Sequence, residues 1–255
     1  VRVVIRNQFL SNLGASLTPS GPSRLERAAF IKASVAQSNL SLFDRDVTQQ
    51  QGQFATLQAK DVEDILSGII VLESTMFWSG SDTSLLMPTT LEWVGALEQI
   101  TLQATIPAGT SKIDGLKTMV AEMVANVDYV VRPTAITLNP LTIDKIEQEA
   151  KAAHIELATA QTTAGIEVTA LQTQAGKLPL ISDPYMPADT GSNYGFSAPP
   201  AGQKNNYAVI ISEPMIEIPY IGGDGKPRIF QLGLTGSLAG QFVGVDFNCL
   251  VVKGY

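Results

Sequence analysis

The stretch NVDYVVRPTAITLNPLTIDKIEQEA, Asn126–Ala150, decides how the rest of the chain is interpreted. It contains the end of one helix, a short apolar strand at residues 134–138 and a second helix predicted over residues 141–153. Asn139 suits the N-cap and Pro140 suits the first helical position, so this helix begins cleanly. In many enzymes the loop after such a strand carries the chemistry, but here it reads only Asn-Pro-Leu-Thr. We therefore interpret the unit as scaffold rather than as an active site.

The composition indicates a subunit whose surface is covered by something, such as copies of itself. Of the 255 residues, 45 % are hydrophobic and only 16 % are charged, whereas ordinary soluble domains carry about 25 % charged residues. The net charge is −7, and Lys and Arg form no run. A nucleic-acid groove needs clustered cations. The sequence therefore argues against such a groove, although it leaves open a wall that encloses nucleic acid.

The sequence shows no segment suited to cross a membrane or to direct secretion. The longest apolar candidate, residues 65–78, is interrupted by polar residues, and no signal-peptide pattern opens the chain. The sequence starts at Val1 inside a predicted strand. We expect that upstream residues were cleaved, disordered or omitted.

The first 56 residues read as extended chain. Strands predicted at residues 1–10 and 24–35 flank a tip rich in Gly and Pro at residues 14–23, which is typical of a long hairpin arm. The arm has no core of its own, and a lone hairpin is marginal in water. We therefore expect the arm to lie on another surface.

Apolar periodicity indicates further helices in the first half of the chain. The strongest covers residues 61–78, with the acidic residues of Asp61–Asp64 in its first turn, where they favour the helix dipole. A short helical piece covers residues 91–100. The run Ser111–Asp114 fits a capping box that opens another helix.

The second half of the chain turns to β-structure after Gly165. Strands are predicted at residues 166–171, 177–181, 207–211, 215–221, 228–234 and 241–252. The run Gly222-Gly-Asp-Gly225 is a hairpin-turn signal that joins the strands on either side of it. In the last strand, the odd-numbered residues from Val243 to Val251 share one apolar face.

The inventory of catalytic side chains is sparse. His154 is the only histidine, and it lies near Lys151 at a helix end without a nucleophile elbow, so we interpret it as a surface residue. Cys249 is the only cysteine, which excludes an internal disulfide or a multi-cysteine metal site and is typical of a small core residue. We predict no catalytic, cofactor-binding or metal-ligating residue.

Two pairs of carboxylates stand out on the predicted helices, Glu147 with Glu149 and Asp61 with Asp64. Such pairs are normally solvated helix faces, and we interpret them so, although sequence alone leaves a glycosidase pair open. The run Gly222–Gly225 lacks the spacing of a phosphate-binding loop and lies between strands.

The order of these elements resembles that of the major capsid proteins of tailed bacteriophages, which have the Hong Kong 97-type fold. The phrases PTAITLNP at residues 133–140 and LPLISDPYMPA at residues 178–188 carry most of the resemblance, which covers essentially the whole chain. It implies an α+β, Hong Kong 97-like capsid fold. Such a fold has an extended hairpin arm, a peripheral domain with a long spine helix, and an axial domain with a central sheet flanked by helices.

The resemblance also implies a division of the chain. The arm would be residues 1–35, lying over a neighbouring subunit. The peripheral domain would be residues 36–110, with the spine helix at residues 61–78. The axial domain would be residues 111–215, and residues 216–255 would return to the peripheral domain.

The implied function is that of a structural protein and not of an enzyme. Hexamers and pentamers of the chain would self-assemble into the icosahedral shell of a virion, built in the host bacterial cytoplasm. The shell would enclose double-stranded DNA without sequence-specific binding. Portal, scaffold and decoration proteins are the implied partners, with no cofactor and no membrane.

Four arginines of the predicted arm, Arg2, Arg6, Arg24 and Arg27, are the candidate inter-subunit contacts, because guanidinium groups pair well with carboxylates of a neighbour. Solvated arginines are the open alternative. Some members of the resembled family crosslink neighbours through a Lys–Asn bond, which needs a lysine on the arm. Residues 1–31 contain no lysine. We therefore predict a shell that is held noncovalently or by separate cement proteins.

Three other functions remain open at the level of sequence. An encapsulin-like nanocompartment shell would share the fold but would need a groove for a cargo peptide. An α/β hydrolase or carbohydrate-active enzyme using acidic residues would lose turnover when its carboxylates are replaced. A structural tail or adhesin module has only the β-rich second half in its favour.

Overall fold

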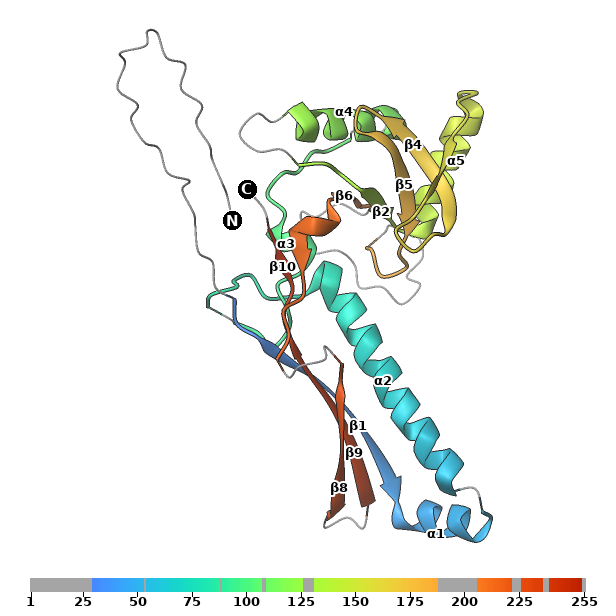
Figure 1. Cartoon of the computed structure of the whole chain (residues 1–255), viewed down its shortest axis with the longest axis vertical. Coiled ribbons are helices and arrows are strands. Elements are labelled where there is room, and N and C mark those ends of the chain that lie inside the picture. The colour runs from blue at the N-terminus through green and yellow to red at the C-terminus, as the bar shows by residue number, and fades with distance from the viewer. Residues whose placement is uncertain are drawn as a thin grey trace, which may run out of the picture. The chain divides into compact units, whose positions relative to one another are not determined.

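The computed structural model describes residues 29–52, 54–87, 89–106, 109–125, 131–187, 206–221, 226–235 and 239–253 (Figure 1). The predicted arm with Arg2, Arg6, Arg24 and Arg27, and the predicted turn Gly222–Gly225, lie outside these residues. The described chain forms two compact units. The first comprises residues 101–216 with residue 253, and the second comprises residues 29–100 and 217–252.

The first unit is built on a five-stranded sheet with the order β3-β4-β5-β2-β6. Its strands are β2 (Ala135–Leu138), β3 (Ala158–Gln161), β4 (Glu167–Thr173), β5 (Gly176–Ser182) and β6 (Ala208–Ile211). Only β2 and β5 run parallel, and the other neighbours are antiparallel. All four residues of β2 are buried, as expected for an inner strand covered on both faces.

Two helices, α4 (Lys112–Ala125) and α5 (Pro140–Ala152), share one core with this sheet. The core contains apolar residues from both helices and from β2, β4 and β5: Ile113, Leu116, Val120, Ile136, Leu138, Ile146, Ala150, Leu171, Leu178 and Leu180. Ile136 and Leu138 are two residues apart on β2, so they point to the same face of the sheet. The buried apolar residues of both helices are therefore the surfaces that fix them to the sheet.

The loop between β2 and α5 is structural, as its sequence indicated. Asn139 is buried and acts as the N-cap of α5, accepting a hydrogen bond at Oδ1 from the Leu141 amide at 3.0 Å. Its Nδ2 donates to the Met186 carbonyl at 2.9 Å, and the amide of Asp183 donates to the Leu138 carbonyl. The loop thus holds the segment that follows β5.

The second unit pairs a three-stranded antiparallel sheet with a long helix. The sheet has the order β1-β9-β8, with β1 (Lys32–Ser41), β8 (Arg228–Thr235) and β9 (Ala239–Asn248). The helices are α1 (Leu42–Gln50), α2 (Phe54–Ser79) and the short α3 (Ala96–Gln99). Figure 1 shows α2 running alongside this sheet. Two short strands, β7 (Ile216–Glu217) and β10 (Val251–Val252), form a separate pair, preceded by the 3-10 turn η1 (Glu213–Met215).

The contact between α2 and the sheet depends on a missing side chain. Ile65 and Ile69 of α2 pack with Phe242 of β9 in a buried cluster. Gly244 lies two residues from Phe242 on the same face, and a Cβ there would come within 2.5 Å of Ile65 Cγ2 and 2.9 Å of Ile69 Cδ1. Glycine at this position therefore lets the two isoleucines reach the sheet.

This packing corrects the predicted face of the last strand. The odd-numbered apolar set of β9 was the expected apolar core face, yet Val243 and Val245 are only half-buried and Phe247 is 40 % exposed. The buried residues are the even-numbered ones from Phe242 to Asn248. Apolar alternation predicted the wrong face because α2 packs on the face that carries Gly244, where its isoleucines have space, and not on the face with the larger apolar side chains. Cys249, just beyond β9, is buried as predicted.

Several predicted boundaries were also wrong. Residues 42–50 form helix α1 rather than extended chain. Helix α2 begins at Phe54, because residues 55–60 include good helix formers, so no acidic residue lies in its first turn. The predicted helix at residues 91–100 is reduced to α3, since Val94 instead bridges to Ser81.

The predicted hairpin around Gly222–Gly225 was wrong as well. Strand β8 pairs with β9, and β7 pairs with β10, so the strands on either side of the turn signal do not pair with each other. Local turn composition could not reveal these partners because both lie further along the chain.

We predict that Gly244→Ala lowers the free energy of unfolding by about 1–3 kcal/mol, because the added methyl group overpacks the Ile65–Ile69 contact. Gly68→Ala is the matched control on α2, since its Cβ would meet only the Ala36 Cβ at 3.9 Å. That control should stabilise the helix by up to about 1 kcal/mol. Urea unfolding followed by circular dichroism measures both. Equal stabilities of Gly244→Ala and the parent chain would contradict the prediction.

Candidate functional site

His154 is a helix-terminating residue in this structure. It is exposed and has a positive φ of 55° just beyond the end of α5. Its amide donates to the Lys151 carbonyl at 3.3 Å, and the Ile155 amide donates to the Ala150 carbonyl at 2.8 Å. These two bonds form a Schellman motif with His154 at the left-handed position, which usually holds glycine. The backbone at this position, rather than imidazole chemistry, accounts for the residue's place.

Cys249 is a buried free thiol of the second unit. Burial raises the pKa of this thiol above its ordinary value. A nucleophilic cysteine needs a lowered pKa and access to substrate. Cys249 therefore has the properties of a small core residue, as its sequence position predicted.

The carboxylate pairs do not form acid–base sites. Glu147 is exposed and accepts a hydrogen bond from the Thr169 hydroxyl at 3.0 Å. Asp64 is exposed, and Asp61 is half-buried with one carboxylate oxygen that has no partner among the described residues. The two residues of each pair also lie on one helix rather than on opposite sides of a cleft, so neither pair flanks a substrate position.

Glu149 corrects the prediction of a solvated helix face. Its carboxylate accepts hydrogen bonds from the Ser111 hydroxyl at 2.7 Å and from the amides of Lys112 and Ile113 at 3.1 and 3.4 Å. The Lys112 ammonium also lies 3.3 Å away. Glu149 of α5 thus caps the N-terminus of α4. Burial raises the pKa of this carboxyl, but these hydrogen bonds outweigh burial and leave its pKa below the ordinary value.

Only half of the capping box predicted at Ser111–Asp114 is formed. The Asp114 amide donates to the Ser111 hydroxyl at 3.1 Å, as a capping box requires, but the Asp114 side chain is exposed. Glu149 supplies the acid at this helix start instead, accepting from the Ser111 hydroxyl and from the amides of Lys112 and Ile113. The sequence analysis missed this role of Glu149. The one available signal was that the third helical position holds Asp114 instead of the usual Glu or Gln.

A buried ion pair also escaped the sequence analysis. The Lys32 ammonium at the start of β1 bonds to the carboxylate of Asp82, which is fully buried, and to the carbonyl of Thr90 at 2.8 Å. Asp82 also accepts from the amides of Thr83 and Thr89 at 2.8 and 3.1 Å. Hydrogen bonding from Lys32 holds the pKa of Asp82 far below its usual value. The hydrogen-bond partners named here all belong to the second unit, so the pair is structural: it joins the start of β1 to the segment at residues 82–90. We call it the Lys32–Asp82 clasp.

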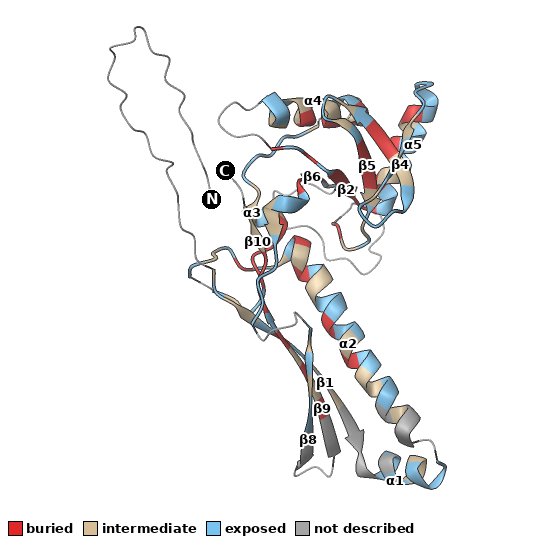
Figure 2. Cartoon of the chain, in the orientation of Figure 1, coloured by how far each residue is buried: buried red, intermediate tan, exposed pale blue. Residues whose placement is uncertain are grey.

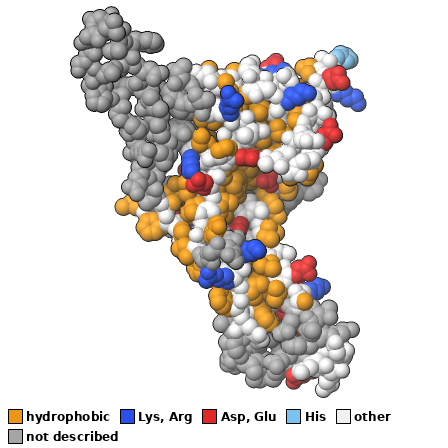
Figure 3. All heavy atoms as spheres, viewed as in Figure 1, with side chains coloured by type: hydrophobic (Ala, Val, Ile, Leu, Met, Phe, Trp, Pro, Cys, Tyr) orange, Lys and Arg blue, Asp and Glu red, His pale blue; other side chains and the backbone are white. Residues whose placement is uncertain are grey.

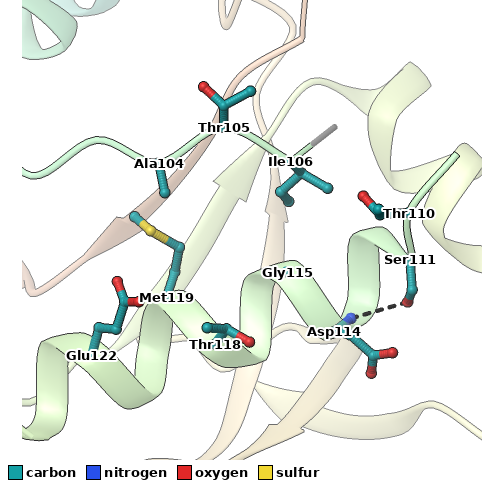
Figure 4. A pocket seen from close by; sticks show the side chains of 10 residues that line it. All are labelled: Ala104, Thr105, Ile106, Thr110, Ser111, Asp114, Gly115, Thr118, Met119 and Glu122. Atoms are coloured by element: carbon teal, nitrogen blue, oxygen red, sulfur yellow. Dashed lines mark hydrogen bonds between the residues drawn. The ribbon is translucent and has the colours of Figure 1, made fainter. Parts of the chain in front are cut away.

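A sizeable hollow lies along α4 in the first unit (Figure 4). It is an open groove of about 380 Å³ between α4 and the chain at residues 104–106. Ile106 and Met119 line its apolar part, and Asp114, Thr118 and Glu122 line its rim. This lining brings no base to a nucleophile and includes no cation.

The described residues also lack the other common kinds of site. They contain no cluster of three or more His, Cys, Asp or Glu side chains placed to hold a metal ion. Within the same residues, no helix has the length and apolar character needed to cross a membrane.

The most distinctive surface of the described chain is apolar. On α2, Ile70 is 60 % exposed, and its neighbours Val71 and Leu72 are also exposed (Figure 2). On the outer face of the three-stranded sheet, Val35 and Phe230 are both about half exposed. Figure 3 shows hydrophobic side chains spread among few charged ones on the face in view. Exposed apolar residues on several elements are typical of a subunit buried by assembly.

Comparison with solved structures identifies the fold. An encapsulin, SrpI of Synechococcus elongatus, matches with a TM-score of 0.55 and 12 % identity over 88 % of this chain and 70 % of that chain. The satellite phage P4 procapsid, which includes the size determination protein, matches with a TM-score of 0.52 and 12 % identity over 99 % and 83 %. Gordonia phage Cozz matches with a TM-score of 0.50 and 14 % identity over 99 % and 76 %.

Sequence comparison adds nothing to these structural matches, because neither a protein-family model nor a curated protein matches the chain. The structural matches nevertheless agree with one another, since each is a shell protein or a phage particle. At these identities the likeness shows the fold alone, which this chain shares with an encapsulin and with two phage structures.

We predict that Glu149→Gln lowers the free energy of unfolding by about 1–3 kcal/mol at neutral pH, because the capped amides of α4 lose a charged acceptor. The pKa of Glu149 is lowered by folding. Its contribution is therefore present above the ordinary value of 4.5 and is lost as the pH falls through the lowered one.

Urea unfolding of both proteins at several pH values measures this difference. It should shrink below pH 4.5, the ordinary pKa of the carboxyl. Glu147→Gln, an exposed change on the same helix, serves as control and should alter stability little. An effect of Glu149→Gln no larger than that of the control would refute the capping role.

We also predict that His154→Gly stabilises the first unit by about 0.5–1 kcal/mol, because glycine occupies the left-handed region without the strain of a Cβ. Ala153→Gly is the matched control: Ala153 has an ordinary φ of −87°, so glycine there should destabilise. Thermal unfolding by circular dichroism distinguishes the two. Destabilisation by both changes would show that the imidazole makes a contact of its own.

Proposed function

The chain has the Hong Kong 97-type fold, and we propose on this basis that the protein is the major capsid protein of a tailed bacteriophage. It assembles as hexamers and pentamers into an icosahedral shell that encloses double-stranded DNA. The observation that carries this choice is coverage: the phage structures align with 99 % of this chain, against 88 % for the encapsulin. The protein is then part of the virion and is assembled in the bacterial cytoplasm.

The two compact units suggest how the subunit is divided. We assign the axial domain to residues 101–216 and the peripheral domain to residues 29–100 with 217–252. The long helix α2 takes the part of the spine helix. The arm over a neighbouring subunit, expected at residues 1–35, is proposed for residues 1–28 only, because β1 begins at Lys32 within the second unit. Arg2, Arg6, Arg24 and Arg27 remain its proposed contacts, and these residues lie outside the described chain.

The physical properties of the chain support an assembling subunit. A low charged fraction of 16 % and exposed apolar residues on α2 and on the sheet are costly for a lone protein in water, and burial between identical copies removes that cost. The acidic balance of −7 suits a container, because a strongly basic wall would bind the enclosed DNA tightly. Portal, scaffold and decoration proteins are the further partners that such a shell requires or accepts.

An encapsulin-like shell is the second candidate, and a specific observation favours it. The encapsulin has a TM-score of 0.55, above the 0.52 and 0.50 of the two phage structures. The two candidates differ in what the shell contains. A phage shell holds nuclease-protected DNA, whereas a nanocompartment holds a cargo protein.

Electron microscopy of the purified protein, expressed alone and with a candidate scaffold, tests the proposal. Closed icosahedral particles that protect DNA from nuclease would support the phage capsid. Closed particles with protein cargo and no DNA would favour the nanocompartment. A chain that stays monomeric in both preparations would overturn the shell function itself.

We predict that Ile70→Lys on the exposed side of α2 abolishes or strongly reduces particle formation while the subunit keeps its circular dichroism spectrum. The reason is that a charge placed in a buried apolar interface is left without a partner. Ile70→Met, which keeps an apolar side chain of similar volume at the same position, is the matched control and should still form particles. Size-exclusion chromatography measures assembly. Normal particles from Ile70→Lys would show that this surface is not an interface.

We further predict that the shell is not covalently crosslinked through the arm, because residues 1–31 contain no lysine. Particles boiled in denaturant should therefore run on a gel as a single band of about 27 kDa, the mass of one chain. A ladder of multiples would contradict the prediction and would require a donor elsewhere in the chain.

A further inference from the structure

A cluster of polar side chains is buried under α2 in the second unit. Glu73 of α2 meets Ser34 of β1 and Asp246 and Asn248 of β9. Ser34, Asp246 and Asn248 are only 3, 7 and 4 % exposed, and Ser34 and Asp246 are cross-strand partners. The cluster therefore occupies the contact between the helix and its sheet, where apolar side chains would ordinarily lie.

Two carboxylates share one hydrogen-bond donor in this cluster. The Asn248 Nδ2 atom donates to Glu73 Oε1 at 2.9 Å and to Asp246 Oδ2 at 3.1 Å. The other oxygen of Asp246 accepts from the Phe247 amide at 2.8 Å, and Asn248 Oδ1 is buried without a partner in the described chain. Both carboxylates thus lie within hydrogen-bond distance of a single neutral nitrogen.

The charged groups of the surrounding elements do not face this pair. On β8, Arg228 is the cross-strand partner of Val245, so it lies on the opposite face of the sheet from Asp246. On β1, Lys32 points to the same face as Ser34, but its ammonium is held by Asp82 and the carbonyls of Thr90 and Glu92. On α3, Glu98 is exposed, and it is itself acidic. In the segment that bridges to Asn248 through Tyr220, the charged residue is Glu217, which is also exposed.

Helices α1 and α2 place no cation next to Glu73. The nearest charged residue of α2 is Asp64, roughly two and a half turns before Glu73. Helix α1, with Asp44 and Asp46, precedes the start of α2 at Phe54, which lies about 28 Å along the helix from Glu73. The cluster is therefore acidic, with Asp246 buried and Glu73 half-buried.

The balance of forces on Glu73 follows from this geometry. Burial raises the pKa of Glu73, the hydrogen bond from Asn248 lowers it, and the charge of Asp246 raises it again, with a net shift upward from 4.5. Two carboxylates in one small site resist the loss of both protons. A proton on one carboxyl would also let it donate a hydrogen bond to the other.

We propose that Glu73 and Asp246 form a proton-sharing pair that fastens α2 to the sheet when one carboxyl is protonated and loosens α2 when both are ionised. The pair makes the rigidity of the second unit depend on pH. This device is a property of the folded chain and does not rest on the proposed capsid function.

The sign of the effect is opposite to that of Glu149. Because folding raises the pKa of Glu73, this carboxyl is protonated more often in the folded chain than in the unfolded chain above pH 4.5. The contribution of Glu73 to stability is therefore fully present below 4.5 and is lost as the pH rises through the raised pKa. Above it, the ionised Glu73 and Asp246 repel each other across the contact between α2 and the sheet.

The two tryptophans make the test selective. Trp78 and Trp93 are the only tryptophans of the chain, and both lie in the second unit. Urea unfolding of the full chain, followed by tryptophan fluorescence from pH 4.5 to 8, therefore reports on the unit that contains the pair. Glu73→Gln imitates the protonated carboxyl, because its amide oxygen still accepts from Asn248 and its charge is gone.

At pH 8 we expect Glu73→Gln to raise the folding equilibrium constant severalfold, because it removes one of two neighbouring negative charges, and at pH 4.5 to change it little. Asp246→Asn should show the same pH pattern, and the double change should add little to either. Glu63→Gln, an exposed change on the same helix, should show no such pattern.

A difference between Glu73→Gln and the parent chain that is equal at all pH values, or that also appears in Glu63→Gln, would overturn the proposal. Asp246→Asn applies the same criterion if Glu73→Gln does not fold.

Discussion

The absence of a side chain at Gly244 is the constraint on which the second unit depends. Because Gly244 has no side chain, Ile65 and Ile69 of α2 can pack directly against the face of β9 that carries it. Once α2 lies there, the even-numbered residues of β9 are buried and the odd-numbered apolar residues are left outward. The buried polar cluster and the exposed apolar face are therefore two results of one packing choice.

The first unit relies on a different kind of constraint. Its apolar core would hold α4 and α5 against the sheet in many relative positions, because apolar contacts have little directionality. Glu149 removes that freedom by reaching from one helix to the first amides of the other. Asn139 does the same between α5 and the segment after β5. A few polar side chains thus fix the geometry that the core makes stable.

The parts of the fold that sequence predicted are those decided by local chemistry. Asn139-Pro140 set the start of α5, and apolar alternation located most strands of the first unit within a few residues. The errors arise where distant residues decide the outcome. The buried face of β9 depends on Ile65 and Ile69 of α2, which lie far earlier in the sequence. Glu149 looked like a solvated acid because its partners lie in a helix whose position no local pattern reveals. The sequence has no recognisable catalytic set, and this predicted a protein that acts through its surfaces rather than through a cleft.

The clasp between Lys32 and Asp82 has a mechanical consequence. Lys32 is the first residue of β1, and its ammonium is bound to a buried carboxylate and to the carbonyls of Thr90 and Glu92. Lys32 is also the first residue of the β1–β9 register, opposite Asn248. A pull on the chain that precedes Ala29 would therefore act on the clasp and on the first pair of the sheet together. The clasp would pass part of this load to the loop at residues 82–92, instead of leaving all of it to hydrogen bonds that open one at a time from the end of the strand.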